Sequence, residues 1–283
     1  MVDDRQGNSG GRPPRRPAGA GASGRDRRGA NAPQRSGPGR ARLAQPQQSS
    51  NGDDGTQRPA APTIPASIEA KQLSPEIRGE LTTLDKSTAD TVARHLVAAG
   101  ELLDEDPQAA LEHAQAARAR SGRIAAVREA VGIAAYQCGD WAQALSEFRA
   151  ARRMGSKSQL LPLIADCERG VGRPERAIEL ARSPEAAQLT GDDADELRIV
   201  AAGARADLGQ LEQALAVLSS PQPDPTRTGS TAARLFYAYA ETLLALDRGD
   251  DALQWFIHAA AADIDGVTAV SYTHLTLPTN REV

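Results

Sequence analysis

The chain has 283 residues and a formal net charge of −4, but the charge is unevenly divided. Residues 1–60 contain 11 Arg and 5 Asp, a net of +6, whereas the other 22 basic and 32 acidic residues give −10. No apolar run reaches the roughly 18 residues needed to cross a bilayer, and no apolar segment of a secretory signal follows the first arginines. The composition therefore excludes a membrane-spanning protein and predicts a cytoplasmic one.

The amino-acid usage suggests a bacterial origin and reduced thiols. Only three Lys accompany 30 Arg, and alanine is abundant, a bias typical of GC-rich bacterial genes. Cys138 and Cys167 are too few for a disulfide scaffold and lack the spacing of a metal site. We predict that both are reduced and packed as small apolar side chains.

Residues 1–61 are predicted to form a disordered arm. Residues 1–60 hold 11 Gly and 7 Pro but no aromatic residue, too little apolar surface to offset the entropy of ordering. Ten Arg and one Asp lie between Arg5 and Arg42. They can contact nucleic-acid phosphates, but without aromatics such binding would be non-specific and salt-sensitive. Two alternatives stay open: a simple linker, or an arm that folds over the acidic body.

Helix-start patterns begin near residue 74, and the alternating apolar runs of strands are missing. Ser74 stands as a capping residue before Pro75, and Ser87-Thr88-Ala89-Asp90 has the form of a capping box. Asp106-Pro107 and Arg173-Pro174 repeat the pattern of a proline at the first helical position. The body is therefore predicted to be helical. A short helix within Pro75 to Leu84 is expected to pack over the first helix pair after it.

One stretch, residues 131–148, carries the pattern of a repeat unit. It runs Val-Gly-Ile-Ala-Ala-Tyr-Gln-Cys-Gly-Asp-Trp-Ala-Gln-Ala-Leu-Ser-Glu-Phe, and Ala151 continues the same helical face. This resembles the tetratricopeptide repeat, in which a Gly-Asp-aromatic turn joins helix A to helix B. The sequence departs from the family at two positions, where Arg128 replaces its usual Trp and Ala135 its helix-A Tyr.

Further copies recur in phase with this unit. The alanines that allow close helix contact are spaced by 34, 33, 37 and 38 residues, at Ala110, Ala144, Ala177, Ala214 and Ala252. Larger residues that fill the adjoining space come directly after them, at Leu111, Leu145, Ile178, Leu215 and Leu253. The two longer spacings fall at Pro-, Gly- and Ser-rich segments, 183–193 and 219–230, which are predicted to be enlarged loops. An ordinary Ala-rich helical bundle is the alternative.

The resemblance implies an all-α fold, a right-handed α-solenoid of antiparallel helix pairs with about five repeats in residues 62–269. Residues 270–283 change abruptly in style to Ser-Tyr-Thr-His-Leu-Thr-Leu-Pro-Thr-Asn and look like translated sequencing adaptor. We expect this tail to be non-native and give it no function.

No catalytic, cofactor or metal site is predicted. The four histidines, His95, His113, His258 and His274, are expected to lie far apart, and they lack a metal-ligand spacing. The acidic groups near 104–106 and 192–193 are expected to cap helices. We therefore predict a non-enzymatic protein.

In the tetratricopeptide family, peptides and protein segments generally bind a concave groove lined by helix A. The resemblance places these candidates in that groove: Val92, His95, Glu129, Ile133, Tyr136, Gln137, Gln159, Asp166, Arg169, Glu196, Ile199, Asp207, Arg234, Tyr237 and Glu241. The basic cluster with which some members hold a C-terminal carboxylate is replaced here by His95, Ala99, Glu129 and Ile133, which disfavours that ligand.

Carboxylates dominate this set, so a basic or neutral protein or peptide partner is expected. The sequence predicts a protein-interaction scaffold. The alternative functions are an RNA- or ribosome-associated factor acting through the arm, and a solvated groove with no specific ligand.

Overall fold

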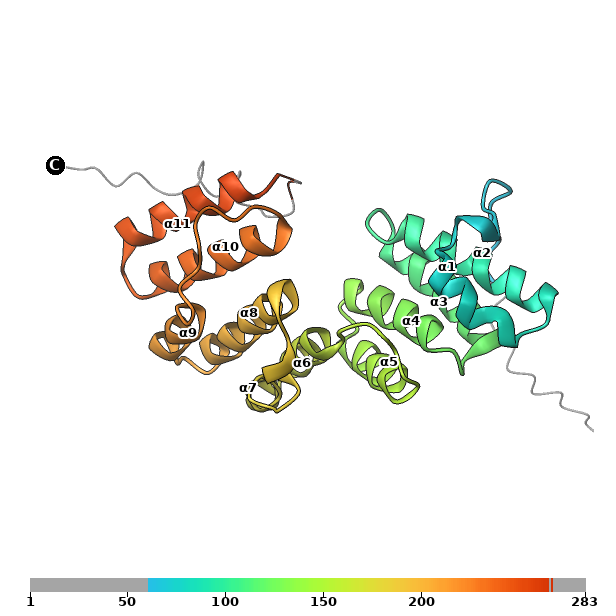
Figure 1. Ribbon diagram of the computed structural model, residues 1–283, viewed down its shortest axis with the longest axis horizontal. Coiled ribbons are helices and arrows are strands. Elements are labelled where there is room, and N and C mark those ends of the chain that lie inside the picture. Colours follow the sequence, from blue (N-terminus) through green and yellow to red (C-terminus); the bar gives the residue numbers. More distant parts are fainter. Residues whose placement is uncertain (1–60, 265, 267–283) are drawn as a thin grey trace, which may run out of the picture. The chain divides into compact units, whose positions relative to one another are not determined.

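The computed structural model describes residues 61–264 and 266, and all regular structure among them is helical (Figure 1). The predicted arm, apart from Ala61, and the predicted tail lie outside the described residues, as does His274. The α-helices are α1 (Pro75–Glu80), α2 (Lys86–Leu102), α3 (Pro107–Ser121), α4 (Ala125–Gln137), α5 (Trp141–Arg153), α6 (Leu161–Gly170), α7 (Pro174–Ala181), α8 (Gly191–Asp207), α9 (Leu211–Leu218), α10 (Ser230–Ala245) and α11 (Gly249–Ala262). Three short 3-10 helices are η1 (Ala70–Gln72), η2 (Leu81–Thr83) and η3 (Ala186–Gln188).

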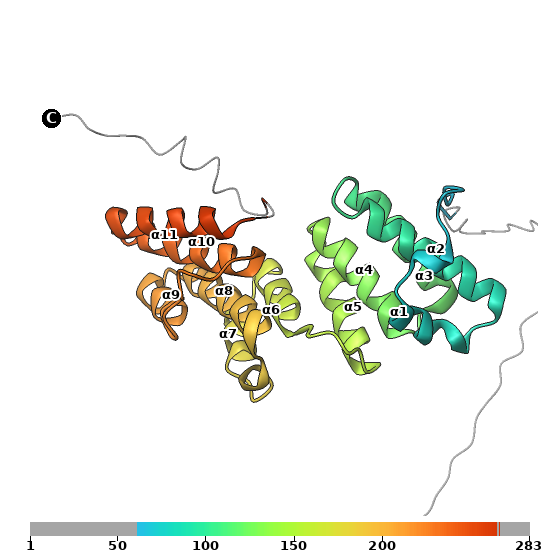
Figure 2. The ribbon, with the colours of Figure 1, turned by 45° about the horizontal axis from the view of Figure 1, so that its top comes forward.

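The helices from α2 onward form the predicted five pairs. Each even-numbered helix packs against the odd-numbered helix after it, and each pair packs against the next (Figures 1 and 2). We call the first helix of a pair helix A and the second helix B, so that α4, α6, α8 and α10 are A helices. The all-α, tetratricopeptide-like helical repeat predicted from the sequence is confirmed for the described residues.

The turn inside four of the pairs has the same backbone conformation. Gly139, Gly172 and Gly209 take φ values of 73°, 76° and 71°, and Asp247 takes the equivalent place with φ 59°. In each turn the next amide closes back onto helix A, as when Asp140 N donates to Ala135 O at 2.9 Å. This helix-ending motif favours glycine because a side chain is strained at positive φ. The recurring Gly therefore marks the ends of the A helices.

The predicted helix starts are correct with one exception. The side chains of Ser74 and Asp106 accept hydrogen bonds from the first turns of α1 and α3, and Pro174 opens α7. The capping box predicted at residues 87–90 is wrong, because α2 begins earlier. Its N-cap is Asp85, whose carboxylate accepts from Thr88 N at 3.0 Å.

The five phased alanines all lie in the core. Ala110, Ala144, Ala177 and Ala214 are fully buried, and Ala252 nearly so. The larger residues next to them behave less uniformly: Leu111 and Leu145 are buried, Ile178 and Leu215 are partly buried, and Leu253 is 42% exposed. The prediction that Leu253 fills a packed space is wrong, since no further helix pair comes after α11 within the described residues.

Two positions of the repeat unit, Gly132 and the departure Arg128, have a local structural explanation. A Cβ added to Gly132 would lie 2.6 Å from two ring carbons of Phe148, so the α4–α5 contact needs a glycine there. Arg128, at the family's Trp position, donates to Gly122 O at 2.7 Å and to Glu147 Oε2 at 2.9 Å. A charged side chain that makes two hydrogen bonds thus stands where the family pattern has an aromatic one.

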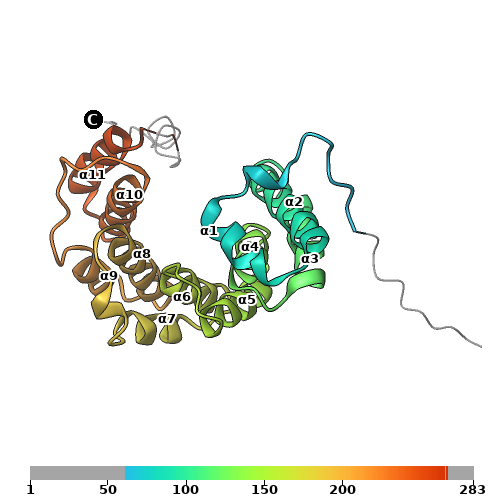
Figure 3. The same ribbon diagram turned by 45° about the vertical axis from the view of Figure 1, so that its right-hand side comes forward.

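The segment before the first pair packs against both of the first two pairs, whereas packing over the first pair alone was predicted. Ile68, Leu73 and Leu81 are buried in one cluster with the apolar face of α2, and α1 lies beside α4 (Figure 3). Glu80, the last residue of α1, accepts from Ala126 N at 3.0 Å, which caps a helix whose own N-cap side chain is apolar. The N-terminal segment therefore closes the first two pairs.

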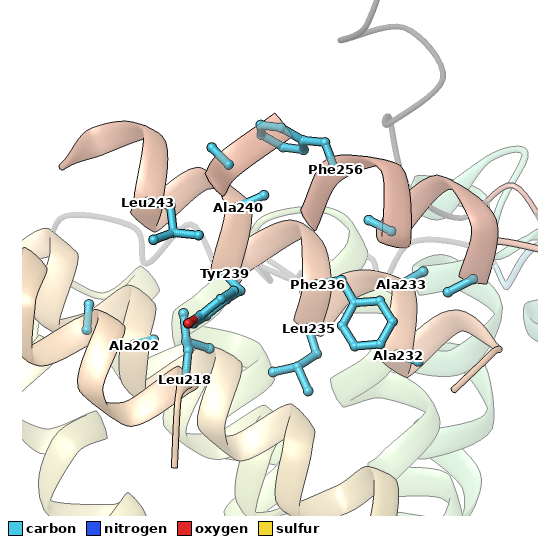
Figure 4. Packing of buried hydrophobic residues seen from close by; sticks show 14 residues of the cluster. Ala202, Leu218, Ala232, Ala233, Leu235, Phe236, Tyr239, Ala240, Leu243 and Phe256 are labelled. Atoms are coloured by element: carbon cyan, nitrogen blue, oxygen red, sulfur yellow. The ribbon is translucent and has the colours of Figure 1, made fainter. Parts of the chain in front are cut away.

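The last two pairs share an aromatic core. Leu218 of α9, Phe236 and Tyr239 of α10 and Phe256 of α11 belong to one buried cluster (Figure 4). The Phe236 ring also meets the Trp255 ring with centroids 5.4 Å apart. Burial of these rings fixes α10 and α11 against α9.

Candidate binding surface

Four of the predicted groove residues form one continuous chain of polar contacts. Tyr136 on α4 donates its hydroxyl to Asp166 on α6. The other Asp166 oxygen accepts from Arg169 at 2.8 Å, and Arg169 Nε donates to Asp207 on α8 at 2.7 Å. We call these four residues the A-face ladder, because they link three successive A helices.

Contacts within the ladder shift the pKa values of two of its members. Burial, together with the hydrogen bond to Asp166, raises the pKa of Tyr136 well above its usual value, so the hydroxyl stays a donor. Burial opposes the charge of Arg169, but the bond to Asp207 and the nearby Asp166 carboxylate outweigh it and raise the pKa of Arg169. The ladder therefore presents a neutral hydroxyl, two carboxylates and one permanent cation.

A cavity of about 500 Å³ opens beside the ladder. It is lined by Trp141, Asp166, Arg169, Gly170, Gly172, Pro174 and Asp207. The Trp141 ring forms one wall and meets Tyr136 edge-on, with the ring centroids 5.0 Å apart. A Cβ on Gly170 would collide with the Trp141 ring, so this glycine lets the ring lie flat on α6. The cavity thus combines an aromatic wall with a charged rim.

Other predicted residues extend this surface to both sides. Arg234 on α10 forms an ion pair with Glu196 on α8, and Tyr237 donates to Glu241 at 3.0 Å within α10. On α4 and its neighbours, Glu129 accepts hydrogen bonds from Ser156 and Ser158, Ile133 is 36% exposed, and Gln137 is exposed. Gln159 is exposed and Ile199 is partly buried.

Two predicted groove residues are not at the surface. Val92 is fully buried, and His95 lies between α2 and α3, where its Nδ1 is 3.0 Å from Nδ1 of His113. The expectation that the histidines are far apart is therefore wrong for this pair, and His95 is removed from the candidate surface. Burial, followed by the neighbouring charges of His113, Arg120 and Arg94, lowers the pKa of His95 to about 4.

The carboxylates of the candidate residues are partly compensated. Asp166 and Asp207 share Arg169, and Glu196 is paired with Arg234. Glu129 and Glu241 accept hydrogen bonds from Ser and Tyr hydroxyl groups, which carry no charge. The set therefore keeps an acidic excess, smaller than the number of its carboxylates suggests.

Sequence reasoning also missed a set of buried acids between the helix pairs. Glu147 contacts Arg118 and Arg128, and Glu168 contacts Arg149 and Arg173. Asp195 of α8 is held in the same way by Arg198 and Arg227. Glu147 and Glu168 lie next to Phe148 and Cys167 in sequence and share the buried faces of their helices. Helical periodicity could therefore have predicted that these two acids are buried.

Both thiols fit the predicted structural role. Burial raises the pKa of Cys167 to about 12 and also raises the pKa of Cys138. In the described part of the chain, no group of three or more His, Cys, Asp or Glu side chains is arranged to hold a metal ion. The helices of that part include none with the length and hydropathy of a membrane span.

The chain is similar to a solved structure, YrrB, described as a TPR protein with an unusual peptide-binding site. The TM-score is 0.41 and the sequence identity 18%, over 68% of this chain and 95% of that one. At this level of similarity the comparison carries no inference about a ligand of the present chain. No family model and no curated protein matches the sequence.

Proposed function

We propose that this protein is a non-enzymatic interaction scaffold that binds a segment of a partner protein on the surface of its A helices. The observation that carries the proposal is the A-face ladder with the adjoining 500 Å³ cavity. Helices from three successive repeats contribute to one surface, which is how repeat proteins build extended binding sites. The cytoplasm is proposed as its compartment on the sequence evidence alone.

The chemistry of this surface suits a mixed polar and apolar peptide. Trp141 and Tyr136 offer aromatic faces with a hydroxyl, a combination enriched at binding sites because it buries area and still satisfies a polar group. Arg169 and the two carboxylates present donors and acceptors at the cavity rim. Because Arg169 offsets one of the two carboxylate charges, selectivity is expected to come from shape and hydrogen bonding as well as from charge.

The proposal is tested by selecting peptides from a random library on the immobilised full chain. Affinities of the selected peptides are then measured by fluorescence anisotropy for the wild type and for the variants Ile133→Ser and Asp207→Asn. We expect each variant to bind roughly fivefold or more weakly, because Ile133→Ser removes an exposed apolar group and Asp207→Asn removes one carboxylate of the A-face ladder. Circular dichroism checks that both variants remain helical.

A matched control separates this surface from general stickiness. Met154, directly after α5, is 41% exposed and lies outside the candidate residues, so Met154→Ser removes a similar exposed apolar group. Selected peptides should bind this variant as well as the wild type. If no peptide is selected, or if all variants bind equally, the A-helix surface is not the binding site.

The second candidate function, association with RNA or ribosomes through residues 5–42, depends on the charge of that segment, which is outside the described residues. Ten Arg against one Asp favour phosphate contacts. The test is RNA binding by the full chain and by a variant with these arginines replaced by Gln. Binding that falls steeply with salt and is lost in the variant supports the second function, and RNA binding that survives the replacement refutes it.

A further inference from the structure

A second cavity lies between α7, α8 and α9, away from the A-face ladder. Its volume is about 210 Å³. The apolar part of its lining consists of Ile178, Ala181, Ala186, Ala194, Leu197, Ala201 and Val217. Three arginines, Arg182, Arg198 and Arg205, complete the wall, and the same three line an adjoining hollow of about 510 Å³.

The three arginines are in different states. Arg198 is held in place, since it is paired with Asp195 and donates to the carbonyl oxygens of Leu218 and Pro221 at 2.6 and 2.7 Å. Arg205 donates only to the neutral Gln210 side chain at 3.1 Å, and Arg182 is exposed. No carboxylate of the described residues forms an ion pair with Arg182 or Arg205.

This pattern differs from that of the A-face ladder. Arg169, at the cavity beside the ladder, is paired with two carboxylates, whereas this cavity keeps two arginines without an ion pair, Arg182 and Arg205, at one apolar wall. An anion bound there gains charge-assisted hydrogen bonds from planar guanidinium groups. The basic arm of residues 5–42 carries the wrong charge to occupy the site.

We propose that this cavity, which we call the arginine cavity, binds an acidic segment of a partner protein in which an apolar side chain is flanked by Asp or Glu. The apolar side chain enters the space against Leu197 and Val217, and the flanking carboxylates meet Arg182 and Arg205. Arginine clusters recognise acidic motifs in this way, and the apolar pocket adds specificity for the residue between the charges.

The arginine cavity is independent of the A-face ladder because α8 presents different faces to the two. Arg205 and Asp207 are two positions apart on α8, which places them about 200° apart around the helix axis. Arg198, Ala201 and Arg205 continue the cavity side at helical spacing. A failure at either site therefore leaves the other proposal standing.

The test uses the full chain and a fluorescein-labelled peptide, Gly-Glu-Glu-Leu-Glu-Glu-Gly. Three comparison peptides replace the Glu residues by Gln, the Glu residues by Lys, or the Leu by Ser. We expect saturable binding of the first peptide only, with at least fivefold weaker binding of each of the others. Decanoate, which combines an apolar chain with a carboxylate, is added as a competitor. If decanoate binds more tightly than the peptide, the proposal that the ligand is a protein segment is overturned.

Substitutions test whether the peptide binds in the arginine cavity. Arg182→Ala/Arg205→Ala should weaken the affinity for the peptide by about tenfold, since two charge-assisted contacts are lost. Arg123→Ala/Arg153→Ala removes the same charge from two exposed arginines outside the cavity and should have no effect. Ala194→Leu, which fills the cavity from α8 with a good helix former, should abolish binding while the far-ultraviolet spectrum is unchanged.

Each result decides the proposal. Loss of binding in the Arg182/Arg205 variant and in Ala194→Leu, with the Arg123/Arg153 variant unaffected, supports it. Equal weakening by both double variants means that the peptide senses only net charge, which overturns the proposal. Absence of saturable binding to the wild-type chain overturns it as well.

Discussion

Glu147 offers the sharpest test of how the helix pairs are joined. Its side chain is 4% exposed and contacts Arg118 of α3 and Arg128 of α4, so one carboxylate ties three helices together. Removing one member of a fully buried ion pair costs about 3–5 kcal/mol. Arg118 and Arg128 keep 37% and 27% of their side chains exposed, so water stabilises them once the carboxylate is gone. We therefore expect Glu147→Gln to lower the free energy of unfolding by about 2 kcal/mol.

The assay is urea unfolding followed by far-ultraviolet circular dichroism. With a typical slope of about 2 kcal/mol per M, the midpoint should fall by about 1 M. The matched control is Glu179→Gln, because Glu179 pairs with Arg176 on the surface of α7, where both side chains are well exposed. That substitution should change stability by about 0.5 kcal/mol or less. Equal midpoints for the two variants would refute the reasoning that the buried carboxylate joins the repeats.

Three further predictions rest on single contacts. Gly132→Ala should destabilise the fold by about 1–3 kcal/mol because the new methyl group meets the Phe148 ring. Gly100 in α2 has open space around it, so Gly100→Ala should stabilise the fold by about 0.5–1 kcal/mol. The urea midpoint should therefore fall for Gly132→Ala and rise for Gly100→Ala. The buried His95–His113 pair should make the free energy of unfolding fall as pH drops from 6.5 toward 4, by about 2 kcal/mol between pH 7 and 5. The reason is that the unfolded chain binds protons in this range, whereas folded His95, with a pKa of about 4, does not. A pH series of urea midpoints should show this slope in the wild type and not in His95→Leu/His113→Leu. Cys167, whose pKa burial raises to about 12, should react with a thiol reagent only on unfolding, while the part-exposed Cys138 reacts in the native state; two thiols reacting at one fast rate would contradict this.

The sequence predicted the helical repeat because its determinants are local. A glycine that ends helix A needs only its own positive φ, and an alanine such as Ala144 marks a close contact by its size alone. These requirements recur with the repeat, so they are visible as spacing. Leu253 was mispredicted for the opposite reason, since its burial depends on a further helix pair that the described residues do not include.

The position of the candidate residues on A helices was predictable, but the pairing of their charges was not. Helical phase correctly placed Tyr136, Asp166 and Asp207 on A helices, where they meet in one ladder. Helical phase also indicates that His95 is buried, because residues 92, 95, 96 and 99 share the apolar face of α2. Which arginine neutralises which carboxylate depends on the offset between successive pairs and on side-chain rotamers, and neither is encoded in the spacing.

Net charge is consequently a poor guide to the partners of this chain. The residues after 60 carry −10 in total. Asp166 and Asp207 of the A-face ladder nevertheless share Arg169, whereas Arg182 and Arg205 of the arginine cavity form no ion pair with a described carboxylate. Coulomb interactions fall off within about 8–10 Å at ordinary ionic strength, so a ligand responds to the local balance of charge. An acidic segment can therefore dock on an acidic protein, and α8 is the helix that separates the partly compensated surface from the cationic one.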